Sequence, residues 1–354
     1  MADLFKVIAP AVLTFAVGIA ITPLITHYLY QYRVWKKRGA RQALDGTDAS
    51  EFNRLHGNLE TEVRTPRMGG IVIWGSVLLT VSGITLVASV WPTAATVKFD
   101  FLSRDQTWIP LMTLLIGALV GFINDVLDVV EGGKGLALRY RLLIIFLLST
   151  FIGWWFYDKL DVVTLGIPFF TPIHLGIFII PLFIATAMTL YASGVIDGID
   201  GLSGGVFAAI FASYTMIAFT QNQINLAAFA ASILGGILAF LWFNIPPARF
   251  YMTETGTMAL TLTIAVLAFT TDTLGNGIGV AVLPIIGFLL FITVASNVVQ
   301  VAGKKLFGVK VFRIAPLHHH FEAIGWPGYK VVMRYWVLAV ICAFMGVLLA
   351  LIGA

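Results

Sequence analysis

The sequence predicts an all-α, polytopic membrane protein of about ten transmembrane helices, and three observations support this fold class. Of the 354 residues, 59% are hydrophobic and only 11% are charged, whereas soluble domains carry about 25% charged residues. Most of the chain lies in apolar runs, and a helix needs about 20 apolar residues to cross roughly 30 Å of hydrocarbon. The sequence lacks the alternating pattern of a barrel, and an open sheet cannot satisfy its backbone groups in lipid. We therefore expect one integral membrane domain over residues 1–354.

The apolar runs are assigned in chain order to ten helices, separated by more polar stretches. The first run is long enough to span and lacks a small-residue cleavage site, so it is interpreted as a helix rather than a removed signal. Pro246 and Pro247 end the seventh run, and Cys342, the single cysteine, lies in the last run as a packed thiol. The predicted spans are 7–30, 69–91, 108–123, 139–157, 173–193, 203–220, 226–243, 257–273, 278–300 and 331–353.

The placement of lysine and arginine predicts how the bundle is oriented. Loops on one side hold 18 of these residues, and loops on the other side hold 4. Because cytoplasmic loops carry an excess of Lys and Arg, the first set is predicted to be cytoplasmic and both termini are predicted to lie outside. Every motif described below falls on the cytoplasmic side, whereas the outer loops 92–107 and 158–172 hold none. The sequence therefore predicts an active site on the cytoplasmic face.

Two pairs of acidic residues follow predicted helices on that side. Asp125 and Asp128, at the end of the third span, are three residues apart and would share one face of a helix. Asp197 and Asp200 have the same spacing within a glycine-rich stretch, where glycine lets the backbone approach a ligand closely. Carboxylates at a membrane boundary can hold Mg²⁺ between the protein and phosphate oxygens. A solvated helix end would explain a single acid, but the acid spacing together with the glycine density favours a binding site.

A third motif covers residues 244–257 and leads into the eighth span. Glu254 stands just before that helix, where a carboxylate can receive a metal or orient helix-end amides toward a phosphate. The aromatic ring of Phe250 or Tyr251 could stack on a base, although aromatic residues are common at membrane interfaces.

Three consecutive histidines, His318, His319 and His320, form the fourth motif. A zinc site is one interpretation, but adjacent side chains cannot easily face one ion, and a second Cys/His cluster is lacking. Imidazoles that bind a phosphate or a sugar fit better. A weaker motif has Arg64 and Arg67 before Gly69 and Gly70, where cations and a Gly-Gly helix start could hold a phosphate, but positive-inside anchoring alone would produce the same residues.

The order of these motifs resembles the phospho-N-acetylmuramoyl-pentapeptide transferase family, from about residue 65 to the C-terminus. The triple histidine with its downstream residues is the most specific part, and it separates this family from sister transferases that load other sugar phosphates. The matching segments are Thr65-Pro66-x-Met68-Gly69-Gly70, Asp-Gly-x-Asp-Gly-Leu over 197–202, Trp242-Phe243-Asn244, Ala315-Pro316-x-His318-His319-His320, Gly325-Trp326 and Arg334-x-Trp336.

The resemblance implies transfer of phospho-N-acetylmuramoyl-pentapeptide from its UDP carrier to undecaprenyl phosphate, which yields lipid I and UMP. It implies a Mg²⁺ cofactor, a homodimer and a location in the bacterial plasma (inner) membrane among membrane lipid, with no nucleic acid as a partner. Asp125 and Glu254 would hold Mg²⁺, and Asp197 and Asp200 would position or help activate the lipid phosphate. His319 would act with these four acids in catalysis. The expected substrate-binding residues are Asn124, Lys134, Asn244, Tyr251, His318 and His320, with Lys134 and the histidines at the diphosphate and Asn244 and Tyr251 at the uridine.

Several positions depart from the family pattern. The family has paired aspartates where this chain has Asn124 and Asp125, and it has Asn where Gly194 stands. Its Met-Gly-Asp-x-Gly-Ser box reads Met-Thr-Glu-Thr-Gly-Thr over 252–257, so Glu254 replaces an aspartate. These departures leave open a sister transferase that loads GlcNAc-1-phosphate, and a catalytically silent homologue. A transporter would carry charges along a path through its spans, whereas these spans are nearly free of charge.

Overall fold

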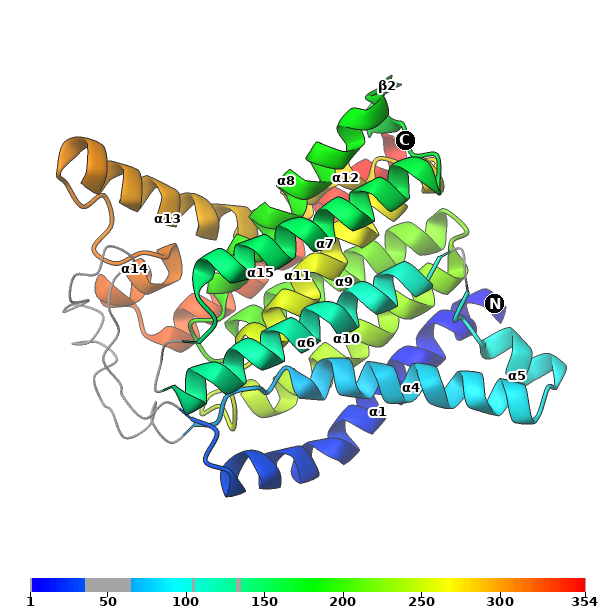
Figure 1. The fold of residues 1–354 in the computed structure, drawn as a ribbon, viewed down its shortest axis with the longest axis horizontal. Coiled ribbons are helices and arrows are strands. Elements are labelled where there is room, and N and C mark those ends of the chain that lie inside the picture. Colours follow the sequence, from blue (N-terminus) through cyan, green and yellow to red (C-terminus); the bar gives the residue numbers. More distant parts are fainter. Residues whose placement is uncertain (1, 36–64, 104–105, 132–134, 354) are drawn as a thin grey trace.

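The computed structural model describes residues 2–35, 65–103, 106–131 and 135–353. It is a bundle of long helices (Figure 1), and ten helical segments within the described ranges are long and apolar enough to cross a membrane. The predicted fold class is thus confirmed. The α-helices are α1 (Ala2–Gln31), α4 (Ile71–Val90), α5 (Ala94–Phe99), α6 (Trp108–Val130), α7 (Leu138–Asp158), α8 (Ile179–Ala192), α9 (Leu202–Thr220), α10 (Ile224–Asn244), α11 (Thr253–Thr270), α12 (Gly279–Ile286), α13 (Phe288–Phe307), α14 (Leu317–Ala323) and α15 (Gly328–Ile352).

The two ends of the chain lie toward the same end of the bundle (Figure 1), which we call the terminal end. The opposite end, which holds α14 and the start of α11, is called the site end. A chain that crosses the membrane an even number of times has both ends on the same side, so this arrangement agrees with ten spans.

Helix α11 lies at the centre of the bundle because its residues are apolar or small on every face. In its most apolar stretch, 94% of the residues are buried, against 22% for α1 and α15. A helix that is apolar all round packs inside other helices, whereas the exposed apolar faces of α1 and α15 suit contact with lipid.

Close packing of α6 against α11 brings the acidic end of α6 to the start of α11. Gly117 and Gly121, one turn apart on α6, make this approach possible. A Cβ atom at Gly117 would lie 3.0 Å from the Cα atom of Ala259, and one at Gly121 would overlap the carbonyl oxygen of Glu254. Small residues spaced by four let helix backbones approach closely in membranes. Helix α6 also continues to Val130, seven residues beyond the predicted end, so Asp125 and Asp128 are helical and buried.

The ninth predicted span, 278–300, is not one continuous helix, so that prediction was wrong in detail. The segment divides into α12 and α13, with Gly287 between them. Pro284 within α12 lacks an N–H group and its ring crowds the preceding turn, and sharp bends in helices occur at such residues. Beyond the break, α13 leans away from the other helices (Figure 1).

The terminal end carries a hairpin where we predicted an unstructured loop and the start of a helix. Strand β1 (Thr164–Ile167) pairs antiparallel with β2 (Phe170–His174). The 3-10 helix η1 (Gly176–Phe178) follows, and α8 begins only at Ile179.

Asp272, which follows α11, joins this hairpin to the bundle. Its Oδ1 accepts a hydrogen bond from the N–H of Gly166 in β1 at 2.7 Å, and its Oδ2 accepts one from Val280 in α12 at 3.0 Å. The side chain is buried, and burial raises the pKa of Asp272 to about 6. One carboxylate therefore connects three elements at the terminal end.

Asp272→Ala should lower the unfolding temperature in detergent, because the N–H groups of Gly166 and Val280 would lose their acceptors. The buried N–H of Gly166 and the partly buried N–H of Val280 would be left without partners, which corresponds to a loss of about 2–4 kcal/mol in the free energy of unfolding. Asp158→Ala is the matched control, because Asp158 is exposed and paired with Lys159, so its effect should stay within about 0.5 kcal/mol. Equal unfolding temperatures for the two variants would contradict this role of Asp272.

Candidate active site

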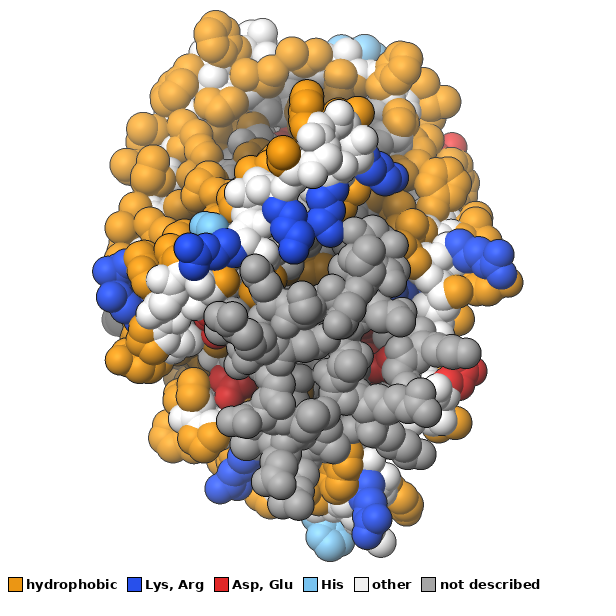
Figure 2. Space-filling view, turned by 90° about the vertical axis from the view of Figure 1, so that its left-hand side faces the viewer, with side chains coloured by type: hydrophobic (Ala, Val, Ile, Leu, Met, Phe, Trp, Pro, Cys, Tyr) orange, Lys and Arg blue, Asp and Glu red, His pale blue; other side chains and the backbone are white. Residues whose placement is uncertain are grey.

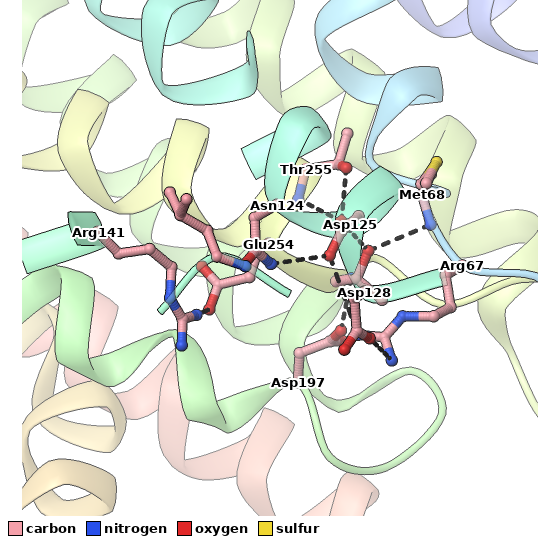
Figure 3. A network of polar contacts seen from close by, with 11 residues as sticks. Arg67, Met68, Asn124, Asp125, Asp128, Arg141, Asp197, Glu254 and Thr255 are labelled. Atoms are coloured by element: carbon pink, nitrogen blue, oxygen red, sulfur yellow. Dashed lines mark hydrogen bonds and ion pairs between the residues drawn. The ribbon is translucent and has the colours of Figure 1, made fainter. Parts of the chain in front are cut away.

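Four acidic side chains meet at the site end of the bundle (Figure 3). They come from three elements that are far apart in the sequence. Asp125 and Asp128 project from the last turns of α6, Asp197 lies in the loop before α9, and Glu254 is in the first turn of α11. Glu254 interacts electrostatically with both Asp125 and Asp197. The structure thus brings together four of the acids that the sequence singled out.

Asp125 is fully buried and fastens α6 to the start of α11. Its Oδ2 accepts three hydrogen bonds, from Thr253 Oγ1 at 2.5 Å, Thr255 N at 2.8 Å and Thr255 Oγ1 at 2.6 Å. The N-terminus of a helix favours negative charge, because its first N–H groups point outward without partners. These donors explain how an ionised side chain is accommodated at this depth.

Two arginines balance part of the acidic charge. Arg67 Nη1 lies 2.7 Å from Asp128 Oδ2, and Arg67 Nη2 lies 3.9 Å from Asp125 Oδ1. Arg141, in the first turn of α7, forms an ion pair with Glu254 across 2.5 Å. Both arginine side chains are mostly buried, so water screens these interactions less than it screens surface pairs. The cluster still contains more acids than bases.

Asp197 is held by one side chain and one backbone group. Its Oδ1 accepts a hydrogen bond from Ser203 Oγ at 2.7 Å, and its Oδ2 accepts one from Thr253 N at 2.8 Å. Burial raises the pKa of Asp197, and the two hydrogen bonds oppose this shift.

The loop that carries Asp197 is bound to the segment after α10. Asp200 Oδ2 accepts a hydrogen bond from Ala248 N at 3.0 Å. Asn244 Oδ1 accepts one from Gly201 N at 2.9 Å, and its Nδ2 donates to the carbonyl oxygen of Phe250, also at 2.9 Å. Gly201 has a φ of 79°, a conformation that glycine adopts at no steric cost. This loop is therefore held in place before any substrate arrives.

The three histidines of α14 do not face the same way. A Cβ atom at Gly198 would lie 2.5 Å from His318 Nε2 and 2.7 Å from His319 Nε2, so both rings pack on the Asp197 loop. His319 Nδ1 lies 2.7 Å from Glu322 Oε2.

His320 points elsewhere. Its Nδ1 accepts a hydrogen bond from Arg313 N at 3.2 Å, and its ring packs on Phe312. Of the three histidines, only His318 and His319 pack against Gly198, which directly follows Asp197 of the acidic cluster.

The donor set of the cluster suits a hard divalent cation. Carboxylate oxygens are the ligands that Mg²⁺ prefers, and the acids outnumber the arginines here. Among the described residues, the contacts of Asp125 Oδ1 are long, 3.4 Å to Asn124 Nδ2 and 3.9 Å to Arg67. No group of three or more His, Cys, Asp or Glu side chains within the described ranges is already arranged around one point. The residues therefore fit Mg²⁺ in chemistry, and a bound ion would compete with Arg141 for Glu254.

The chain is similar to known transferases over most of its length. Residues 107–272 match the model of glycosyl transferase family 4. A phospho-N-acetylmuramoyl-pentapeptide-transferase from Thermoanaerobacter sp. (strain X514) is 32% identical over 343 residues, which cover 96% of this chain and 97% of the relative. The protein of that name from Caldanaerobacter subterraneus subsp. tengcongensis is 33% identical over 284 residues, which cover 79% and 83% of the two chains. This chain belongs to the phospho-N-acetylmuramoyl-pentapeptide-transferase family. The resemblance drawn from its motifs is thereby confirmed.

The substrate-binding residues predicted for this family member occupy different settings. Asn124 is buried, and its Oδ1 accepts a hydrogen bond from Leu136 N at 3.0 Å. Both polar groups of the Asn244 amide bind backbone within the chain, which favours a structural role over contact with uridine. The backbone of Tyr251 forms hydrogen bonds with Pro66 and Gly69. Lys134 lies outside the described residues.

Several residues of the site carried little signal in the sequence. Arg67 stood out only as a cation before a Gly-Gly helix start, and Arg141 only as one of many basic residues on one side of the membrane. Thr253 and Thr255 flank Glu254, yet their hydroxyl groups contact Asp125 on another helix. Such pairings depend on tertiary packing, so hydropathy and motif spacing do not reveal them.

Asn124→Asp should destabilise the metal-free protein and increase the stabilisation that Mg²⁺ provides. The substitution keeps an acceptor for Leu136 N, but it replaces the donor that faces Asp125 by a second negative charge. Unfolding temperatures in EDTA and in millimolar Mg²⁺ would measure both effects. Asn222→Asp, in an exposed turn at the terminal end, is the matched control. A Mg²⁺-induced shift no larger than that of the unsubstituted protein would contradict the expectation.

Proposed function

We propose that this chain transfers phospho-N-acetylmuramoyl-pentapeptide from UDP to undecaprenyl phosphate, with release of UMP. The observation that supports this function best is the cluster of Asp125, Asp128, Asp197 and Glu254 with Arg67 and Arg141 at one end of a membrane bundle. A lipid phosphate requires a site at a membrane face, and a nucleotide sugar requires access to water. The relatives named above carry the name of this activity. The homodimer and the single domain remain expectations.

The proposed mechanism relies on positioning and charge neutralisation, which dominate phosphoryl transfer. Asp125 and Glu254 would hold Mg²⁺, as predicted. When bound, the ion would neutralise charge on the diphosphate of the nucleotide sugar. Arg67 and Arg141 would bind phosphate oxygens, for which guanidinium groups have a fitting geometry.

Asp197 is suited to act on the lipid phosphate. Because burial raises its pKa, this carboxylate is a better proton acceptor than an exposed aspartate. Ser203 and Thr253 orient it. Asp200 binds Ala248 N and would support the loop rather than touch the reacting atoms. His318 and His319 border this loop and would contact the diphosphate.

Purified protein in detergent should release UMP from UDP-N-acetylmuramoyl-pentapeptide only when undecaprenyl phosphate and Mg²⁺ are both present. Asp125→Asn should lower kcat by at least about 100-fold, and EDTA should abolish turnover. UMP release with UDP-GlcNAc, but not with UDP-N-acetylmuramoyl-pentapeptide, would identify a sister transferase instead. Nucleotide binding without turnover by the unsubstituted protein would identify a silent homologue.

The site end is proposed to face the cytoplasm of a bacterial inner membrane. Figure 2 looks onto this end, where lysine and arginine side chains are spread over the face and acidic side chains lie among them. Basic residues concentrate on the cytoplasmic side of membrane proteins, and 18 of the 22 lysines and arginines lie in loops that the sequence predicts to be cytoplasmic.

In a Cys342→Ser background, Lys310→Cys should react with an impermeant thiol reagent only from the cytoplasmic side. Lys159→Cys, at the terminal end of α7, should react only from outside. Both lysines are exposed, so a difference in labelling reports sidedness rather than burial. Labelling of both positions from one side would refute the proposed orientation.

A further inference from the structure

Thr253 has an unusual backbone conformation at the centre of the acidic cluster. It is the first residue of α11 and has a φ of 54°. A positive φ is uncommon for residues other than glycine and is strained for a β-branched residue. Such conformations persist where the surrounding structure enforces them, and they concentrate at functional sites.

The contacts of Thr253 connect three separate segments. Its backbone N–H donates to Asp197 Oδ2 at 2.8 Å, and its hydroxyl donates to Asp125 Oδ2 at 2.5 Å. The same hydroxyl oxygen accepts a hydrogen bond from Met68 N at 3.1 Å. One residue thus contacts the end of α6, the Asp197 loop and the segment before α4.

Capping of α11 does not explain this arrangement. The residue in the N-cap position is Met252, and no side chain caps the helix there. Thr255 also binds Asp125, through its backbone N–H and its hydroxyl. Thr253 is distinguished by its contacts with two different carboxylates.

We propose that Thr253 is a positioning residue that sets the orientation of the Asp125 carboxylate relative to that of Asp197. This inference rests on the proposed function and adds a residue to it. Because one donor belongs to the backbone and the other to the side chain of the same residue, neither carboxylate can turn without disturbing the other. In the proposed reaction, Asp125 holds the cation and Asp197 acts on the lipid phosphate. Thr253 therefore couples cation binding at Asp125 to the placement of Asp197, the carboxylate that acts on the lipid phosphate.

Three substitutions separate the two kinds of contact. Thr253→Val keeps the shape and the backbone N–H but removes the hydroxyl. Thr253→Ser keeps both donors, and Thr253→Gly accepts the positive φ without a hydroxyl. Thr263→Val is the matched control, because Thr263 lies on the same helix and its buried hydroxyl donates to the carbonyl oxygen of Ala259.

Thr253→Val should raise the Mg²⁺ concentration required for half-maximal UMP release by about 10–100-fold, the usual effect of removing a residue that orients a metal ligand. Thr253→Gly should behave similarly, whereas Thr253→Ser should restore the Mg²⁺ requirement to near that of the unsubstituted protein. Thr263→Val should leave it unchanged. If Thr253→Val resembles Thr263→Val, or if serine fails to rescue, the proposal is overturned.

A second measurement tests Thr253 independently of catalysis. Without Mg²⁺, Thr253→Val should lower the unfolding temperature, and it should do so much less in an Asp125→Ala background, because the hydrogen bond is already absent there. Equal losses in the two backgrounds would overturn the proposal. If the unsubstituted protein releases no UMP while this coupling is present, the proposed function fails and the positioning role of Thr253 stands.

Discussion

The packing of α6 against α11 determines where Asp125, Asp128 and Glu254 lie relative to one another. Gly117 and Gly121 bring the two backbones together, and Asp125 completes the contact by accepting three hydrogen bonds from the start of α11. A buried carboxylate without donors would cost several kcal/mol. The interaction that stabilises the helix pair therefore also holds a negative charge at the membrane boundary, where the proposed reaction requires it.

The remaining charges are arranged around this carboxylate. Arg67 and Arg141 form ion pairs with Asp128 and Glu254. In a partly buried setting these pairs are strong, yet each arginine has the geometry to bind a phosphate instead. The same groups thus stabilise the protein without substrate and remain suited to bind a highly charged one. Removing either arginine alone would leave an acid without its counter-ion.

The sequence predicted the bundle well, because length and hydropathy alone decide whether a helix can cross a bilayer. It also singled out Asp125, Asp128, Asp197 and Glu254 as candidate site residues. Their spacing and their places beside the predicted helices can be read from the local sequence alone. It did not predict the break at Gly287 or the hairpin, since both depend on how neighbouring segments pack. The sequence assigned all three histidines to the diphosphate, and it did not predict that their side chains face different ways. Consecutive residues on a helix point about 100° apart, so His320 is directed toward Arg313 rather than toward Gly198.

The glycine contacts between α6 and α11 also fix the position of the two helices relative to one another along the bundle axis. A shift of one residue along either helix moves side chains by about 1.5 Å, and at Gly121 there is no room even for a methyl group beside the Glu254 carbonyl. The two helices therefore cannot slide past one another in small steps. The positions of Asp125 and Glu254 along the bundle axis are thus fixed relative to one another, so in the proposed reaction the lipid phosphate would have to reach the level that these carboxylates set.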